Sequence, residues 1–187
     1  MLYFRYMDSS LAQFIEHASG KPDVKLKFLN RLDEGNLTRP ENPTSHFCVY
    51  FAAVDPFQKS VFIGLHKKSG LWLFNGGHLD KDETLPHALI REASEEWGIP
   101  IDEATLRMPE LATITEIEHP ERQICEWHYD LWYFLPFSAE MFHPDPTLLA
   151  TEFQETGWFS YQTARLRVTD PATLEALDFL ENRSHNS

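Results

Sequence analysis

The sequence predicts an α/β or α+β fold in which a β-sheet is sandwiched between α-helices. Three observations support this prediction. A chain of 187 residues matches about one domain and can bury roughly two-thirds of its unfolded surface. Runs rich in β-branched and aromatic residues alternate irregularly with amphipathic segments, which favours a mixed sheet over a doubly wound one. With 42% hydrophobic and 24% charged residues, the composition is typical of a globular protein and excludes a disordered or fibrous chain.

Two short helices are predicted within residues 8–35. The triplet that begins at Asp8 can cap the first helix, and Gly20 can end it. Pro22 can open the second helix, which Gly35 ends. We therefore predict an N-terminal helical extension.

The extension is predicted to cover residues 1–45 and to pack on a main domain of residues 46–187. In that domain β-branched and aromatic runs predict strands, and Gly76-Gly77 predicts a loop before the central helix. Asp170-Pro171 predicts the start of a last helix. The expected elements are strands 46–54, 60–66, 71–75, 111–118, 124–135 and 157–160, and a helix over 84–97. The strands over 111–118 and 124–135 are predicted to form a hairpin around His119-Pro120.

The charge is strongly acidic, with 16 basic and 29 acidic residues and a net charge of −13. Such a surface repels phosphate backbones, so we expect no general nucleic-acid binding. The longest apolar run, residues 47–54, is far shorter than the ~20 residues that span a bilayer, so we expect no membrane insertion. The first residues lack the pattern of a signal peptide, and we therefore expect a cytoplasmic protein.

The two cysteines, Cys48 and Cys125, both lie in apolar stretches. This placement predicts two buried thiols in a reducing compartment. Zinc sites usually show closer spacing of cysteine and histidine along the chain, so the sequence predicts no zinc site.

Three carboxylates of the predicted helix share one face. Glu92, Glu95 and Glu96 stand at positions i, i+3 and i+4, and apolar residues of the preceding turns continue the same arc. Two carboxylates about 4 Å apart repel by roughly 4 kcal/mol at an effective dielectric of 20. Three carboxylates that are partly removed from water therefore require a cation to balance their charge. Oxygen ligands suit Mg²⁺ or Mn²⁺. Arg91, four residues before Glu95, can orient the cluster.

The segment Gly77–Ile99 resembles the Nudix box, G-x5-E-x7-R-E-U-x-E-E-x-G-U, where U is a bulky aliphatic residue. Ala93 replaces the first of these aliphatic residues, which predicts slightly looser packing without loss of chemistry. All seven fixed positions are present: Gly77, Glu83, Arg91, Glu92, Glu95, Glu96 and Gly98.

The resemblance implies a Nudix fold and hydrolysis of a pyrophosphate bond in a nucleoside diphosphate linked to another moiety. Family substrates include nucleoside triphosphates, oxidised nucleotides, ADP-ribose, dinucleoside polyphosphates and capped RNA. The implied cofactor is Mg²⁺ or Mn²⁺, and relatives are frequently homodimers. Two alternatives are a nucleotide-binding sensor that has lost turnover and an isoprenoid diphosphate isomerase, although the intact box disfavours both.

The resemblance also implies site residues. A backbone carbonyl near the paired glycines and a carboxylate before the last strand often join the box glutamates on the metal, and Glu83 supports the site. The general base is Glu92 or a glutamate outside the box. The implied metal ligands are Gly77, Glu92, Glu95, Glu96 and Glu152, and the implied catalytic residues are Glu92, Glu95, Arg91 and Glu83.

Candidate substrate-binding residues flank the glycine pair. His46, Asn75 and His78 are candidates for contact with phosphate or base, although a lone histidine is more often a hydrogen-bonded structural residue. His128 lies on the second face of the strand over 124–135, which is either exposed to solvent or one wall of the ligand cleft. The N-terminal helices either cap this cleft or pair two subunits in a homodimer.

Overall fold

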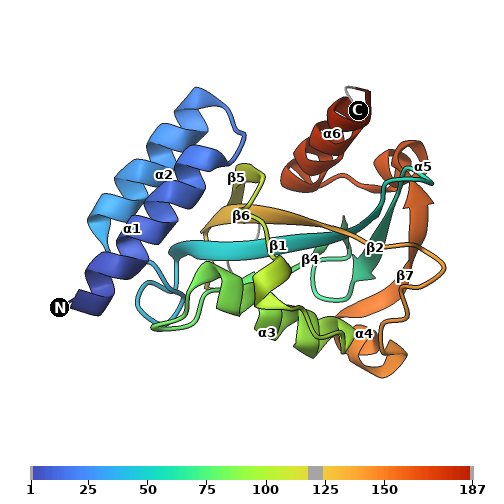
Figure 1. Cartoon of the computed structure of the whole chain (residues 1–187), viewed down its shortest axis with the longest axis horizontal. Coiled ribbons are helices and arrows are strands. Elements are labelled where there is room, and N and C mark those ends of the chain that lie inside the picture. The colour runs from blue at the N-terminus through green and yellow to red at the C-terminus, as the bar shows by residue number, and fades with distance from the viewer. Residues whose placement is uncertain (1, 118–123, 186–187) are drawn as a thin grey trace. The chain divides into compact units, whose positions relative to one another are not determined.

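The computed structural model describes residues 2–117 and 124–185. Within them, six α-helices accompany one mixed β-sheet (Figure 1). No helix in these ranges is both long and apolar enough to cross a bilayer. The chain forms two compact units: the first comprises residues 1–50, 77–89 and 103–133, and the second comprises residues 51–76, 90–102 and 134–187.

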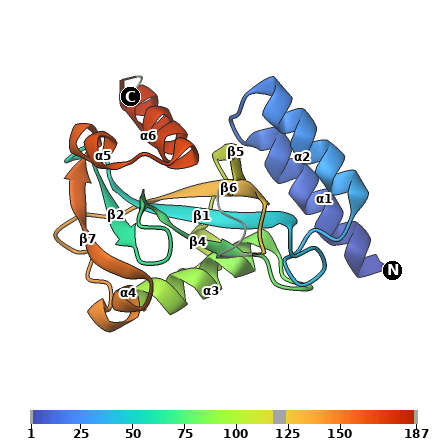
Figure 2. The same cartoon turned by 180° about the vertical axis from the view of Figure 1, so that it is seen from behind.

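The first unit begins with two helices that lie side by side, α1 (Leu2–His17) and α2 (Pro22–Glu34) (Figure 2). The second helix has the predicted bounds, and Gly35 follows it at a φ of 67°, a left-handed conformation that favours glycine. The predicted start of the first helix at Asp8 is wrong. No glycine or proline separates Leu2 from Asp8, so the helix continues through the expected cap.

Strand β1 (Ser45–Asp55) runs through both units, whereas β5 (Leu111–Glu116) pairs with the first residues of β6 (Trp127–Pro136). This antiparallel pair confirms the predicted hairpin, with Leu111 opposite Trp132. The turn predicted at His119-Pro120 lies outside the described residues.

Both faces of β6 are largely buried, contrary to one interpretation of the sequence. His128, Asp130 and Trp132 are buried, so the predicted solvent face is wrong. In the sheet order, β6 lies between β1 and β5, so neighbouring strands pair with both of its edges, whereas burial of its faces requires elements packed against the sheet. The first residue of β6 is an exception, since Trp127 is 40% exposed.

The second unit contains β2 (Ser60–His66), β3 (Trp72–Leu73) and β7 (Phe153–Ser160). Strand β7 pairs antiparallel with β2 along its whole length, which explains why it begins before the predicted residue 157. The hydrogen-bonded strand order is β3-β2-β1-β6-β5, with β4 on β1 and β7 on β2. The paired glycines belong to β4 (Asn75–His78) and do not form the predicted loop.

The central helix α3 (Leu85–Trp97) has nearly the predicted bounds, and Gly98 follows it at a φ of 67°. The last helix, α6 (Pro171–His185), is also confirmed, and the Thr173 amide donates to Asp170 at its start. Three short elements were not predicted, since each is too brief to show a clear period. They are the 3₁₀ helix Glu103–Thr105, α4 (Pro146–Glu152) and α5 (Tyr161–Arg167).

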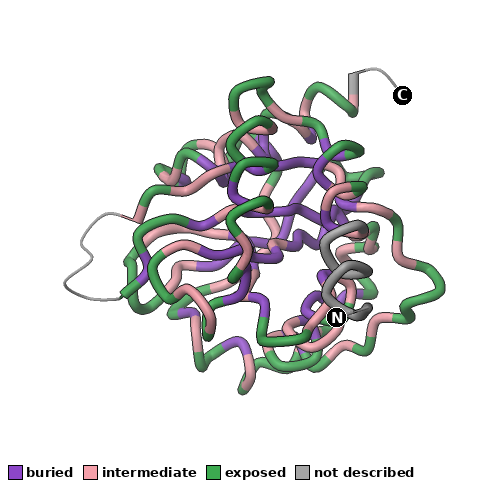
Figure 3. The backbone as a smooth tube through the Cα atoms, turned by 90° about the vertical axis from the view of Figure 1, so that its left-hand side faces the viewer, coloured by how far each residue is buried: buried purple, intermediate pink, exposed green. Residues whose placement is uncertain are grey.

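Buried residues concentrate along the strands, as the tube in Figure 3 shows. Arg31 is a buried basic residue of the first unit, with a side chain that is 2% exposed. Its guanidinium donates to the backbone carbonyls of Gly35, Asn36 and Ser45 at 2.7–2.8 Å and to the Ser45 hydroxyl at 3.2 Å. The Arg31 guanidinium therefore links the end of α2 to the first residue of β1.

We predict that Arg31→Met destabilises the protein by about 2–4 kcal/mol, because three backbone carbonyls lose their donor and the apolar methionine side chain cannot replace it. Urea denaturation of the two proteins measures this difference. Arg107 is exposed and provides a matched control, for which Arg107→Met should change stability by less than about 0.5 kcal/mol. Equal effects of the two substitutions would contradict the role given to Arg31.

Candidate active site

The carboxylates of α3 differ in their exposure. The Glu92 side chain is 12% exposed, whereas that of Glu95 is 60% exposed. One guanidinium nitrogen of Arg91 donates to both, at 2.7 Å to Glu92 Oε1 and at 3.3 Å to Glu95 Oε2. The contact with Glu95 confirms the orientation expected from the spacing. The shorter contact with Glu92 was not predicted.

Among these carboxylates, Glu96 has the least favourable environment for a negative charge. It is partly buried, and burial raises its pKa to about 8, with further increases from the negative charges of Glu92 and Glu152. The Asn75 side-chain amide and the Gly76 N–H both donate to this carboxylate and oppose the increase. These two donors therefore fix the orientation of Glu96. In the absence of a cation, Glu96 keeps its proton at neutral pH.

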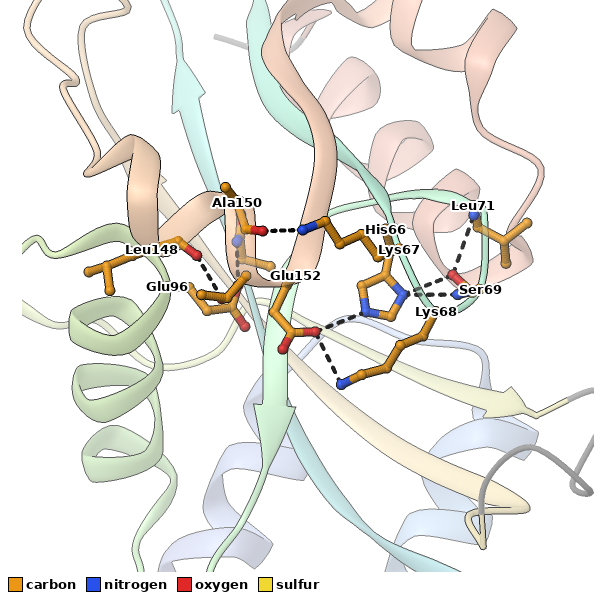
Figure 4. A network of polar contacts seen from close by, with 11 residues as sticks. His66, Lys67, Lys68, Ser69, Leu71, Glu96, Leu148, Ala150 and Glu152 are labelled. Atoms are coloured by element: carbon orange, nitrogen blue, oxygen red, sulfur yellow. Dashed lines mark hydrogen bonds and ion pairs between the residues drawn. The ribbon is translucent and has the colours of Figure 1, made fainter.

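Glu152 approaches this group from another element. It is the last residue of α4, and β7 begins directly after it. Figure 4 shows its carboxylate beside His66 at the end of β2 and Lys68 in the following turn. The distances are 3.4 Å to His66 Nε2 and 3.2 Å to Lys68 Nζ. The backbone joins the same segments, since the Lys67 N–H donates to the Glu152 carbonyl at 2.8 Å.

The orientation of the His66 ring follows from its neighbours. The hydroxyl of Ser69 lies 2.9 Å from His66 Nδ1, and the Ser69 N–H also faces this atom at 3.4 Å. We therefore assign the ring proton to Nε2, which donates to Glu152. Burial lowers the pKa of His66, although Glu152 opposes this effect. Sequence reasoning missed His66 and Lys68, because they approach Glu152 only through the pairing of β2 with β7.

The other predicted site residues lie in the first unit. Glu83 Oε2 accepts a hydrogen bond from the Asp80 N–H at 2.9 Å, which closes the turn before α3. Gly77 lies within β4. The remaining three are His46, His78 and His128, which lie close to one another and of which the first and last are buried.

In the second unit, the carboxyl groups of Glu92, Glu96 and Glu152 interact with one another; Asn75 and Gly76 donate to Glu96, and His66 and Lys68 contact Glu152. Carboxylate oxygens are the ligands that Mg²⁺ and Mn²⁺ prefer. Repulsion and burial both favour protonation of Glu96, and a divalent cation would oppose both effects. The donor set thus fits a divalent cation that prefers oxygen.

Several solved structures resemble this chain. One is a dihydroneopterin triphosphate pyrophosphohydrolase from E. coli, with 18% identity over 78% of this chain and 98% of the other, and a TM-score of 0.60. A MutT protein from Methanosarcina mazei has 19% identity over 76% and 94% of the two chains, and a TM-score of 0.52. A bifunctional NMN adenylyltransferase/ADP ribose pyrophosphatase from Francisella tularensis, complexed with AMP and an Mn ion, has 15% identity over 74% and 41%, and a TM-score of 0.51.

At such identities, the structural likeness concerns the fold. No curated protein matches the chain by sequence. The family model described as the NUDIX domain matches residues 52–181, which is more than half of the chain. The sequence expectation is thereby confirmed: this chain belongs to the Nudix family.

Proposed function

We propose that the chain is a Mg²⁺- or Mn²⁺-dependent hydrolase that cleaves a pyrophosphate bond in a nucleoside diphosphate linked to another moiety. The observation that carries this proposal is the grouping of Glu96 with Glu92 and Glu152 in the second unit. The names of two structural neighbours, a triphosphate pyrophosphohydrolase and an ADP ribose pyrophosphatase, support this class of substrate. The acidic net charge of −13 favours a small nucleotide over a nucleic acid.

The residues proposed to hold the cation are Glu92, Glu96 and Glu152, with exposed Glu95 as a further ligand that the resemblance implies. A bound cation neutralises phosphate charge and lowers the pKa of a nearby water. Asn75 and Gly76 orient Glu96. Arg91 is a positioning residue, because its guanidinium fixes the Glu92 carboxylate and also reaches Glu95.

The chain itself supplies charge and proton transfer. Lys68 and the neutral ring of His66 hold Glu152 in one orientation, and Lys68 adds positive charge where phosphate oxygens would approach. We propose Glu92 as the general base that removes a proton from the attacking water, with Arg91 keeping that carboxylate in place. Pyrophosphate hydrolysis requires chiefly this positioning and charge stabilisation.

Glu96→Gln should lower turnover by at least ~10²-fold, about 2.7 kcal/mol in the activation barrier, because the amide removes the negative charge from a proposed ligand. The fold should survive, since the substitution also removes repulsion from Glu92 and Glu152. The measurement is kcat at saturating substrate and metal. Glu140→Gln changes an exposed glutamate outside the site and should retain wild-type turnover. Equal turnover of both variants would refute the ligand assignment.

The raised pKa of Glu96 also predicts how stability depends on pH in protein free of Mg²⁺ and Mn²⁺. The folded protein retains this proton up to about pH 8, whereas the unfolded chain releases it near the ordinary value of 4.5. This contribution to folding is therefore fully present below pH 4.5 and is lost as the pH rises through about 8. The maximal slope is about −1.4 kcal/mol per pH unit.

Urea denaturation between pH 5 and pH 8 tests this dependence against Glu96→Gln. The variant lacks the titrating group but retains the rest of the chain, so the difference between the two slopes isolates Glu96. Parallel curves for the two proteins would show that Glu96 titrates normally in the folded state.

The reaction class is tested by phosphorus NMR of the products from a panel of nucleotides. A nucleoside triphosphate should give the monophosphate and pyrophosphate, and a sugar-linked dinucleotide should give the monophosphate and a sugar phosphate. Activity should require Mg²⁺ or Mn²⁺ and disappear in EDTA. Orthophosphate released from monophosphate esters, or full turnover in EDTA, would contradict the proposal. Binding of a nucleotide without any product would favour the alternative of a sensor.

A further inference from the structure

A second cluster of metal-ligating side chains lies in the first unit, and its ligand atoms differ in chemistry from the carboxylates. The ring centroids of His46, His78 and His128 form a near-equilateral triangle with sides of 4.8, 5.0 and 5.1 Å. One ligand atom from each of these imidazoles and the sulfur of Cys48 all lie within 4.8 Å of one another. We propose that His46, Cys48, His78 and His128 bind one Zn²⁺ ion as a structural site.

The topology explains why these residues meet. His46 and Cys48 are two positions apart in β1, so their side chains lie on the same face of the strand. His78 is the last residue of β4 and His128 is the second of β6, and both strands are neighbours of β1 in the sheet. The second cysteine, Cys125, precedes β6, and its sulfur lies 3.8 Å from the Nε2 atoms of His46 and His78. Both cysteines of the chain therefore lie at this cluster, and neither forms a disulfide.

Hydrogen bonding orients one of the imidazoles for metal binding. His46 Nδ1 lies 2.9 Å from the Asn42 carbonyl oxygen, which can only accept, so this nitrogen carries the proton. The lone pair is then on Nε2, the atom that faces the thiol of Cys125. Zinc-binding histidines commonly donate their second ring N–H to a carbonyl in this way.

His128 supplies an independent argument. It is 93% buried, with 7% of its surface exposed, and neither ring nitrogen has a hydrogen-bond partner within the described part of the chain. Leaving such a buried polar group unsatisfied is destabilising. A zinc ion among the three imidazoles would use one of these nitrogens.

The protonation state also suits a metal. Burial lowers the pKa of His128 to about 3, with smaller contributions from His46 and Arg39, and burial lowers the pKa of His46 as well. Both imidazoles are therefore neutral at neutral pH, which is the form that donates a lone pair to a metal. Three charged imidazoles at these separations would repel one another instead.

The donor set selects zinc over the cations proposed for the carboxylates. Nitrogen and sulfur ligands suit Zn²⁺, whereas Mg²⁺ and Mn²⁺ prefer oxygen. In a tetrahedral zinc site the nitrogen–sulfur separation is about 3.6 Å, from bond lengths of roughly 2.0 and 2.3 Å. The ligand atoms of the four-residue set lie within 4.8 Å of one another, so zinc binding requires them to move closer together. Four protein ligands in a buried place are typical of a structural site rather than a catalytic one.

Zinc content of the purified full-length protein tests the proposal. Wild-type protein, dialysed against Zn²⁺ and then against buffer, should contain one zinc per chain by inductively coupled plasma mass spectrometry. His128→Ala should lower zinc affinity at least ~100-fold, because it removes one of four ligands. His143→Ala replaces an exposed histidine and should retain one zinc per chain. Wild-type protein without bound zinc, or equal zinc affinity of His128→Ala and wild type, would overturn the site.

The fourth ligand and the independence of the two sites need separate variants. Cys48→Ser should lose zinc and Cys125→Ser should retain it, since Cys48 is the sulfur that completes the four-residue set. The reverse result would contradict this ligand set. Glu96→Gln should keep one zinc per chain even where turnover is lost, so failure of the zinc site and failure of the proposed hydrolysis are distinguishable.

If the histidine variant does not fold, wild-type protein still provides a test. Metal-free wild-type protein titrated with Co²⁺ should develop the absorption of a thiolate–metal bond at one equivalent. Rebinding of Zn²⁺ should raise its melting temperature. Absence of the thiolate absorption together with an unchanged melting temperature would overturn the proposal.

Discussion

The rest of the second unit depends on one constraint: several carboxyl groups lie close together and are partly shielded from water. Glu96 has its pKa raised to about 8, and both Glu92 and Glu152 add to the repulsion. Donors and counter-charges gather around this group: Asn75 and Gly76 on Glu96, Arg91 on Glu92, and His66 and Lys68 on Glu152. Such a cluster is unfavourable without a cation and well suited to one, which is the arrangement that a metal-dependent phosphoryl site requires.

The local features of this arrangement are visible in the sequence, and the non-local ones are not. The box helix and the contact of Arg91 with Glu95 follow from a period of 3.6 residues and an i, i+4 spacing. His66 and Lys68 reach Glu152 through an antiparallel pairing across more than 80 positions of the chain, which no local pattern encodes. The alternation in β6 likewise separates two faces but does not reveal that both are covered.

The histidine cluster is a second feature that the sequence alone does not reveal. Along the sequence, His46, His78 and His128 are isolated, and each was considered separately as a contact for phosphate or base. The sheet brings them within about 5 Å of one another and adds both cysteines. The burial of His46 and His128 favours a structural role over contact with substrate. Hard oxygen ligands in one unit and soft nitrogen and sulfur ligands in the other would allow two different metals to bind independently.

The most direct test of the carboxylate site is calorimetry of Mn²⁺ binding at pH 7 in buffers of different ionisation enthalpy. Glu96 must release its proton to bind a cation, so its pKa of about 8 predicts release of nearly one proton for each Mn²⁺ bound. Glu96→Gln should bind Mn²⁺ more weakly and release no such proton. Mn²⁺ binding by the wild-type protein without proton release, or with the same affinity and proton count in both proteins, would contradict the account.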